Sequence, residues 1–333
     1  MSHVDLAWAH GTLRAIPTGA MIADLSFRLA SGHVFAPFAH RHWSPADPGC
    51  AGLPPHLQHL GAEFACLPFG VGGPVRDVAS PWQALNVERC NDPPHGLAAN
   101  AAWTLEQQTD TRLCFTLDYP SDHAIRRLTR ILSVQPEAPA LDLVLRIEAR
   151  RTACISVGLH PILSLNAPPE SVRIRARFRQ GFTYPAAVPG DAMLAAIGQT
   201  FGELSSVPAR AGGTVDLSRL PKVMPVDDVV QLCALDGPVE IIFAEQKAAL
   251  TLDWDRSLLP SCQFWISDRA LGHAPWAGRY RGLGVEPIAS AFDFSEAVSL
   301  AKNPIQTTGT ATSLAITPDR VTDIAYRIEA RRA

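Results

Sequence analysis

The stretch Leu141-Asp-Leu-Val-Leu-Arg-Ile-Glu-Ala149 sets leucine or isoleucine at every second position, and this alternation decides the fold class. A second stretch, Ser171-Val-Arg-Ile-Arg-Ala-Arg-Phe-Arg179, alternates more strictly and sets four arginines opposite four apolar residues. Successive side chains of a strand point to opposite faces, so both stretches predict strands with one buried face. We interpret the arginines as the solvated face of an edge strand, where charge opposes association between sheets.

Most of the remaining chain also divides into short segments, because 28 prolines and 23 glycines interrupt it. This pattern is typical of many strands rather than of long helices. Further strands are predicted at Val239–Ala244, Ala249–Trp254, Cys262–Ser267, Ala311–Thr317 and Ile324–Glu329, and short helices at Asp191–Thr200 and Ser295–Lys302. Residues 44–60 are predicted to form a surface loop. We therefore expect an all-β protein, a sandwich of two antiparallel sheets in a single domain spanning residues 1–333.

Composition excludes several classes of partner. The 333 residues carry a net charge of −3, which offers no electrostatic footprint for nucleic acid or an anionic membrane. The seven cysteines form no CxxC pair and are odd in number, which disfavours a disulfide framework or a zinc site. No basic N-terminal segment precedes an apolar run, and no 18-residue apolar window occurs. The expected compartment is the cytoplasm.

Three motifs combine a titratable side chain with a constrained backbone: Pro93-Pro-His-Gly96, Gly158-Leu-His-Pro161 and Arg281-Gly-Leu-Gly-Val-Glu-Pro-Ile288. A residue before proline is biased towards extended geometry, so Glu286 is expected at a strand end, pointing in one direction. Histidine and glutamate exchange protons near neutral pH. The three motifs together indicate an acid–base site, although a single histidine beside a turn is more commonly a structural residue.

Other candidates carry less chemistry. His40-Arg-His42 and His56-x-x-His59 place pairs of histidines at short spacings. Metal sites need three or four converging ligands, and no carboxylate or cysteine stands at a matching spacing, so no metal site is predicted. The glycine-rich run Gly70-Val-Gly-Gly73 lacks a following Lys-Ser/Thr, which disfavours a phosphate loop.

The order of the three motifs resembles that of the aldose 1-epimerases, or galactose mutarotase-like proteins. The residues that carry the resemblance are His95-Gly96 followed by Trp103, Gly158-Leu-His160, and Gly284-Val-Glu-Pro287. Leu13–Leu25 also looks like the family's opening hairpin. The resemblance implies a large antiparallel β-sandwich, the galactose mutarotase-like supersandwich, with the site in a cleft on one sheet.

The resemblance also implies an activity, that of an isomerase that interconverts the α and β anomers of an aldose or an aldose derivative. Glu286 is then the catalytic base, His160 the catalytic acid, and His95 a ligand of the sugar. Acid and base terms of roughly 10²–10⁴ each are adequate for this ring opening, so we expect no metal and no cofactor. The expected partner is a monosaccharide, and the expected assembly is a monomer or homodimer.

Two features of the family are altered in this chain. Where the family carries an Asn-Arg pair before the His-Gly, the chain reads Pro68-Phe-Gly-Val-Gly-Gly73, so Arg76 or Arg89 is expected to replace that arginine, and we choose Arg76. The family's substrate-binding aspartate falls near Asp227-Asp228, of which we choose Asp228. Among the tryptophans, Trp265 is expected to stack on a sugar face.

The position of a phosphosugar-binding arginine in the hexose-6-phosphate branch is occupied here by Ala99, which disfavours a phosphorylated substrate. Two alternatives remain open from the residues alone. One is a sugar-binding or regulatory protein without turnover, against which the presence of both His160 and Glu286 argues. The other is a glycoside-cleaving enzyme built on two carboxylates, such as Asp228 and Glu286.

Overall fold

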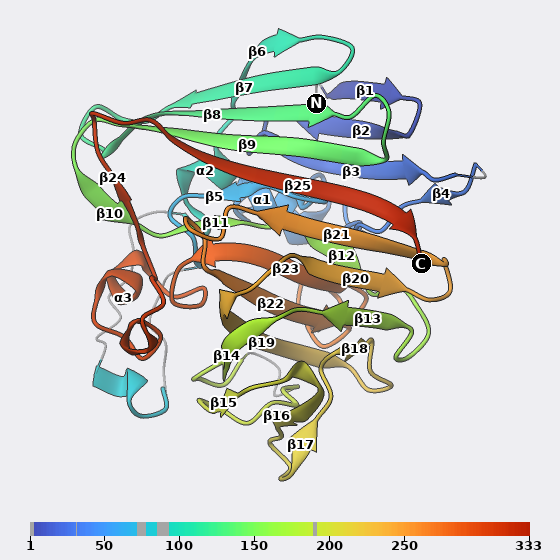
Figure 1. Cartoon of the computed structure of the whole chain (residues 1–333), viewed down its shortest axis with the longest axis vertical. Coiled ribbons are helices and arrows are strands. Elements are labelled where there is room, and N and C mark those ends of the chain that lie inside the picture. Colours follow the sequence, from blue (N-terminus) through green and yellow to red (C-terminus); the bar gives the residue numbers. More distant parts are fainter. Residues whose placement is uncertain (1–2, 31, 72–77, 85–92, 189–191) are drawn as a thin grey trace.

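The computed structural model describes residues 3–30, 32–71, 78–84, 93–188 and 192–333, and antiparallel strands dominate them (Figure 1). The larger sheet has nine strands in the order β18-β13-β20-β21-β25-β9-β8-β7-β6. In that order the strands span Arg219–Leu220, Val172–Arg175, Val239–Phe243, Ala248–Trp254, Thr322–Arg332, Ala140–Ala149, Ile125–Val134, Arg112–Asp118 and Thr104–Gln108. In Figure 1 these strands follow one another down the view from β6 to β13.

The second large sheet has eight strands and carries the candidate site. Its order is β15-β14-β19-β22-β23-β11-β5, and β12 also pairs with β23. The strands span, in that order, Thr200–Phe201, Phe178–Thr183, Val226–Leu235, Ser261–Asp268, Arg281–Ala289, Val157–Leu159 and Ala65–Cys66, with β12 at Ile162–Ser164.

Smaller elements complete the chain. A four-stranded sheet contains β1 (Val4–Trp8), β2 (Gly11–Ile16), β3 (Met21–Arg28) and β4 (Val34–Phe35). Two-stranded ribbons join β10 (Ala153–Ile155) to β24 (Leu314–Ile316), and β16 (Val207–Pro208) to β17 (Thr214–Val215). The short α-helices are α1 (Pro55–His59), α2 (Gly96–Asn100) and α3 (Glu296–Leu300), and 3-10 turns lie at Pro48–Cys50, Trp82–Ala84, Leu204–Ser206 and Gln306–Thr308. In the described part of the chain, no helix has the length and apolar character needed to cross a membrane.

The alternation of side chains along each strand divides the eight-stranded sheet into two faces. Cys262, Phe264 and Ile266 of β22 join Phe115 and Leu132 of the other large sheet in one buried cluster. Residues of the opposite parity, such as Gln263 and Trp265, face away from that cluster. The all-β fold expected from the sequence is confirmed. The outer face of this sheet, which is turned away from the buried cluster, is available for a site.

The predicted strands are found with small changes of boundary. The arginine stretch divides into β13 and β14, and its four arginines are exposed as expected. The helix predicted at Asp191–Thr200 is wrong, because residues 192–200 contain no helix. The surface loop predicted for residues 44–60 is found only in its first part, because residues 55–59 form α1, whose His56 and His59 are buried.

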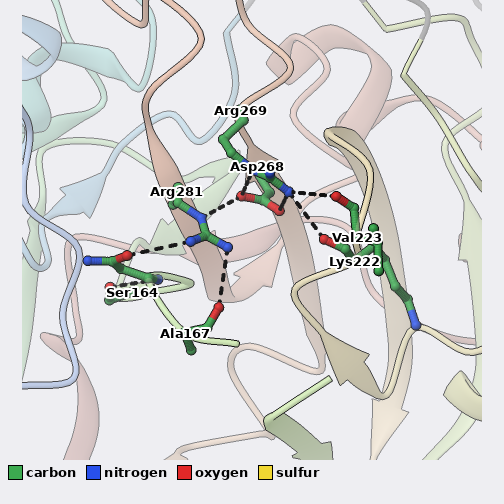
Figure 2. Close-up of polar contacts among 8 residues, drawn as sticks. Ser164, Ala167, Lys222, Val223, Asp268, Arg269 and Arg281 are labelled. Carbon is green, nitrogen blue, oxygen red and sulfur yellow. Dashed lines mark hydrogen bonds and ion pairs between the residues drawn. The ribbon is translucent and has the colours of Figure 1, made fainter. Parts of the chain in front are cut away.

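A buried carboxylate fixes the beginning of β23 (Figure 2). Asp268, at the end of β22, has no exposed surface and accepts hydrogen bonds from Arg269 Nε at 3.0 Å and from Arg281 Nε at 2.8 Å. Arg281 also donates to Ala167 O at 3.4 Å, and Arg269 donates to Lys222 O at 3.2 Å. Asp268 therefore links the beginning of β23 to the neighbouring strand β22 and to the segments that contain Ala167 and Lys222.

The substitution Asp268→Asn is expected to lower the free energy of unfolding by about 3 kcal/mol, because it leaves two guanidinium groups without a buried counter-charge. Urea unfolding followed by fluorescence measures this change. The control is Asp253→Asn, which removes a partly exposed pair with Arg256 and is expected to cost under about 1 kcal/mol. Equal losses in the two variants would contradict the role given to Asp268.

Candidate active site

The site begins with an interruption in the strand beside β23. β11 pairs with the end of β23 through Gly158 and Ile288, and β12 pairs with its beginning through Ile162 and Gly284. In antiparallel pairing the two residue numbers have a constant sum, which is 446 in both pairs. The same register places His160, between β11 and β12, directly opposite Glu286.

The side chains of these two residues meet on the outer face of the sheet. His160 Nε2 lies 3.4 Å from Glu286 Oε1. On the other side of β23, Gln263 Nε2 donates a hydrogen bond of 2.8 Å to Glu286 Oε2. Glu286 has no exposed surface, and His160 is buried. The expected strand end is wrong, because Glu286 lies inside β23, where the interruption beside it makes room for the imidazole.

Two neighbouring features hold this pair in place. A Cβ on Gly284 would lie 2.1 Å from Glu286 Oε1, so only glycine leaves the carboxylate its position. The ring of Phe64 stacks on His160 with a centroid distance of 4.6 Å and an interplanar angle of 17°. The backbone of Phe64 also accepts a 2.8 Å hydrogen bond from the His160 amide, which fixes the histidine at the start of the gap.

His95 reaches the same place from a tight turn. It adopts φ 61° and precedes Gly96, whose φ is 74° and whose added Cβ would lie 1.9 Å from Leu67 O. Gly96 is therefore required by both conformation and space. The turn brings the ring of His95 to 5.0 Å from that of His160, centroid to centroid. The two sequence motifs that contain these histidines thus converge, although 65 positions separate them.

These residues line a cavity of about 390 Å³ on the outer face of the sheet. That volume falls within the range of about 300–1,000 Å³ usual for small-molecule sites. Val229, Gln263, Trp265 and Glu286 come from the sheet, whereas Pro54, His56, Leu57, Leu60, Phe64, Val71, Pro94, His95, Trp276 and Asp293 come from the segments that cover it. The walls are largely apolar, with a few polar groups directed into one space.

Several of these polar groups have no protein partner. Glu286 Oε1, Gln263 Oε1, Asp293 Oδ1, His95 Nδ1 and His160 Nδ1 are all buried and make no hydrogen bond. Buried polar atoms in native proteins are nearly always satisfied. Five such atoms around one cavity therefore indicate a polar ligand with several hydroxyl or carbonyl groups.

Burial shifts the protonation of the central pair towards neutral forms. It raises the pKa of Glu286 well above its ordinary range; the nearby Asp293 carboxylate adds to this rise and the bond from Gln263 opposes it. Burial lowers the pKa of His160 to about 3, and His56 contributes to the lowering. Both shifts disfavour the charged forms, so these surroundings favour a neutral His160 beside a Glu286 that holds the proton.

Comparison with solved structures shows the same arrangement of sheets in other proteins. A GalM/aldose epimerase homologue from C. elegans aligns with a TM-score of 0.63 and 11% identity over 100% of this chain and 99% of that one. An Escherichia coli K12 protein, provisionally named an aldose 1-epimerase, aligns with a TM-score of 0.67 and 14% identity over 100% and 99% of the two chains. A galactose mutarotase-like protein from Clostridium acetobutylicum aligns with a TM-score of 0.62 and 11% identity over 99% and 95%.

The chain has the galactose mutarotase-like fold. No protein-family model and no curated protein matches its sequence. The likeness therefore rests on the arrangement of the strands over nearly the whole length, at low sequence identity. Within this mutarotase-like fold, the cavity lies on the eight-stranded sheet, in agreement with the cleft implied by the sequence resemblance.

The remaining predicted site residues have different outcomes within the mutarotase-like fold. Trp265 lines the cavity, and its ring stacks with Tyr280 at a centroid distance of 6.1 Å. Asp228 is a correction: it shares a strand face with the buried Val226 and Val230, opposite to the cavity, and its Oδ2 accepts backbone N–H bonds from residues 194 and 195. Arg76 falls outside the described residues.

Three polar residues of the cavity, His56, Gln263 and Asp293, were not predicted from the sequence. Gln263 was missed, although the predicted strand Cys262–Ser267 places it on the same face as Trp265. Asp293 follows β23 in an irregular segment, where no periodic pattern indicates direction. His56 was considered only as part of a histidine pair in a surface loop, and its burial depends on the position of α1.

Two other candidate sites lack the same support. A more open hollow of about 620 Å³ lies against β13 and β14, but its Arg175 already pairs with Glu240, and its walls lack a histidine. Within the described ranges, no three or more His, Cys, Asp or Glu side chains are arranged to hold a metal ion. The smaller cavity beside Glu286 therefore remains the candidate active site.

Gly284→Ala is expected to displace the Glu286 carboxylate from His160 and to lower stability by about 1–3 kcal/mol, since the new methyl group overlaps Oε1. A crystal structure and thermal unfolding of the variant measure both effects. Gly272→Ala is the matched control, because its added Cβ meets no atom within 4 Å. An unchanged 3.4 Å separation in Gly284→Ala would refute the steric requirement.

Proposed function

We propose that this protein is an aldose 1-epimerase, which interconverts the α and β anomers of a monosaccharide by opening and closing its ring. The observation that supports this most directly is the buried pair of His160 and Glu286, 3.4 Å apart in a cavity of sugar size. Anomer exchange needs one proton donor and one proton acceptor on the same side of a reacting centre. This pair provides both.

The proposed reaction moves two protons and breaks one bond. Glu286, as the carboxylate, accepts the proton of the anomeric hydroxyl on C1, while the imidazolium of His160 donates a proton to the ring oxygen. The bond between C1 and the ring oxygen breaks, its electron pair goes to that oxygen, and C1 becomes an aldehyde. Rotation about the bond from C1 to C2 presents the other face, and the same steps in reverse close the ring.

The proton count of the pair fits this scheme. The neutral form, with the proton on Glu286, and the charge-separated form, with the proton on His160, contain the same single proton. A sugar hydroxyl that donates to Glu286 and a ring oxygen that accepts from His160 both favour the charge-separated form. The stacked ring of Phe64 favours it further, because an aromatic face attracts a cation. The substrate itself thus prepares the base and the acid.

The surrounding residues would position the sugar. His95 would hydrogen-bond the sugar near its ring oxygen, since its ring lies 5.0 Å from that of His160. Trp265 offers an apolar face for the C–H groups of a pyranose. Gln263 holds Glu286 through Oε2 and leaves Oε1 for the substrate.

The two alternatives have less support. A glycoside-cleaving enzyme that uses Asp228 and Glu286 would need both carboxylates in one cleft, but they project from opposite faces of the sheet. A binding protein without turnover would have no use for a buried acid–base pair, because its burial carries a desolvation cost. Neither alternative explains the opposed positions of His160 and Glu286.

Exchange between α and β anomers of several aldoses, followed by NMR, tests the proposal. The wild-type protein is expected to accelerate exchange of at least one sugar, and His160→Ala and Glu286→Gln are each expected to reduce the rate by about 10²–10⁴-fold. No acceleration across a broad panel would refute the proposed activity, whereas wild-type rates in both variants would refute the residue assignment.

Thermal unfolding at pH 8 controls for misfolding of Glu286→Gln. Because the folded-state pKa of Glu286 is raised, its ionisation destabilises the fold as pH rises above the unfolded value. The neutral glutamine removes that cost, so the variant is expected to unfold at a temperature no lower than the wild type. A large drop in this temperature would mean that the loss of activity reflects structure.

The rate should stay nearly constant between pH 6 and pH 8, within about twofold, after the uncatalysed exchange is subtracted. The lowered pKa of His160 and the raised pKa of Glu286 both favour the state in which Glu286 holds the proton beside a neutral His160, so the pair does not titrate like an ordinary histidine. A pair with ordinary pKa values would lose its proton at about pH 6.5. A fall in rate centred at about pH 6.5 would contradict a proton shared by His160 and Glu286.

A further inference from the structure

A third histidine belongs to the same cavity and has no role in the proposed proton transfers. His56, on α1, lines the cavity, and its ring centroid lies 5.1 Å from that of His95. The ring of Phe64 lies 5.8 Å from His56 and also contacts His95 and His160. Three imidazoles therefore surround one aromatic ring at the edge of the cavity.

Asn100, at the end of α2, holds His56 in a fixed direction. Its Nδ2 donates two hydrogen bonds of 2.8 Å, to Pro94 O and Gly96 O. Its Oδ1 lies 3.2 Å from the His56 backbone N–H and 2.9 Å from His56 Nδ1. The same amide thus joins the turn that carries His95 to the helix that carries His56.

These contacts determine which nitrogen of His56 carries the proton. The two carbonyl oxygens accept only, so the NH₂ group of Asn100 must face them and its oxygen must face His56. An oxygen that accepts from Nδ1 requires a proton on that nitrogen. Burial lowers the pKa of His56, so its ring is neutral at pH 7. Nε2 therefore has a free lone pair, and no other described residue makes a hydrogen bond to it.

We propose that His56 is a specificity-determining residue, whose Nε2 accepts a hydrogen bond from a sugar hydroxyl remote from the anomeric carbon. Asn100 is its positioning residue. The substrate class is therefore an aldose with a free hydroxyl at that position. An ether or a phosphate there has no proton to donate, and an anion would face an acceptor lone pair. This inference rests on the proposed function for the site but names a contact that the ring opening does not require.

A purely structural role accounts for only half of the residue. The bond from Nδ1 to Asn100 would stabilise the loop, but it leaves Nε2 of this cavity-lining ring without a partner among the described residues, where an apolar ring would fill the space at lower cost. A metal-binding role is disfavoured because Nδ1 is already committed to Asn100 and the described histidines form no metal-holding group. A hydroxyl donor satisfies the remaining nitrogen.

Two substitutions of His56 distinguish the role of Nδ1 from that of Nε2. The amide nitrogen of His56→Asn occupies the place of Nδ1 and keeps the bond to Asn100, but nothing replaces Nε2. His56→Gln extends its amide oxygen to the place of Nε2 and keeps an acceptor there. His59→Asn is the matched control, because His59 is equally buried on the same short helix and does not line the cavity.

The experiment measures anomer exchange by NMR and sugar binding by calorimetry, using the best aldose substrate and its monodeoxy derivatives. His56→Asn is expected to raise KM and Kd by about 10- to 100-fold with kcat within about threefold of wild type, because the contact is equal in ground and transition states. His56→Gln is expected to recover most of the affinity. One monodeoxy sugar, the one that lacks the hydroxyl bound by Nε2, should bind the wild type as weakly as the parent sugar binds His56→Asn. The His56→Asn variant should bind this monodeoxy sugar and the parent sugar with equal affinity.

Other outcomes overturn the inference. If His56→Asn matches wild type and His59→Asn on every sugar, or if it loses affinity equally for all the deoxy sugars, Nε2 does not bind a hydroxyl. Should His56→Asn fail to fold, His56→Gln and His56→Phe give the same comparison with and without an acceptor. Exchange by the wild type without any effect of His56 would refute this inference alone. Sugar binding without exchange would refute the enzymatic proposal and leave the calorimetric comparison to decide on His56, whereas no binding of any sugar would refute both.

Discussion

The site depends on one constraint, which is the register of β23 between β22 and the interrupted strand formed by β11 and β12. Because the pairs on both sides of the interruption share one register, His160 is placed directly opposite Glu286. A slip of one residue would turn Glu286 into the core and Val285 into the cavity. The Asp268 network at the start of β23 opposes such a slip, since it joins the two strands at a buried charge.

Burial of His160 and Glu286 determines the protonation of the pair and also destabilises the fold. Apolar walls raise the pKa of Glu286 and lower that of His160, so that Glu286 holds the proton beside a neutral His160. The walls also leave several polar atoms without partners, which destabilises the fold until a ligand supplies them. A site that is incomplete without its ligand is typical of proteins that trade stability for function. His56, which lines the cavity and is held by Asn100, is a further buried histidine at this site.

Local sequence was sufficient for much of the fold and for the centre of the site. Alternation at Leu141–Ala149 predicted β9 with its buried face, because burial of one strand face is read directly from a period of two. It failed for α1, where a proline-rich segment was taken for a surface loop. Short helices and irregular cover segments have no periodicity, and only their contacts with the sheet decide whether they are buried.

The sequence by itself determined that the protein is an antiparallel β-sandwich and that His95, His160 and Glu286 stand in constrained motifs. Only the tertiary structure decided which of two adjacent residues faces the cavity and which distant residues meet there. Asp228 turned away from the cavity because a strand alternates its faces and a one-residue error in parity reverses direction. His56, Gln263 and Asp293 entered the cavity because strand pairing and the folding of loops over the sheet bring together residues that no local pattern connects.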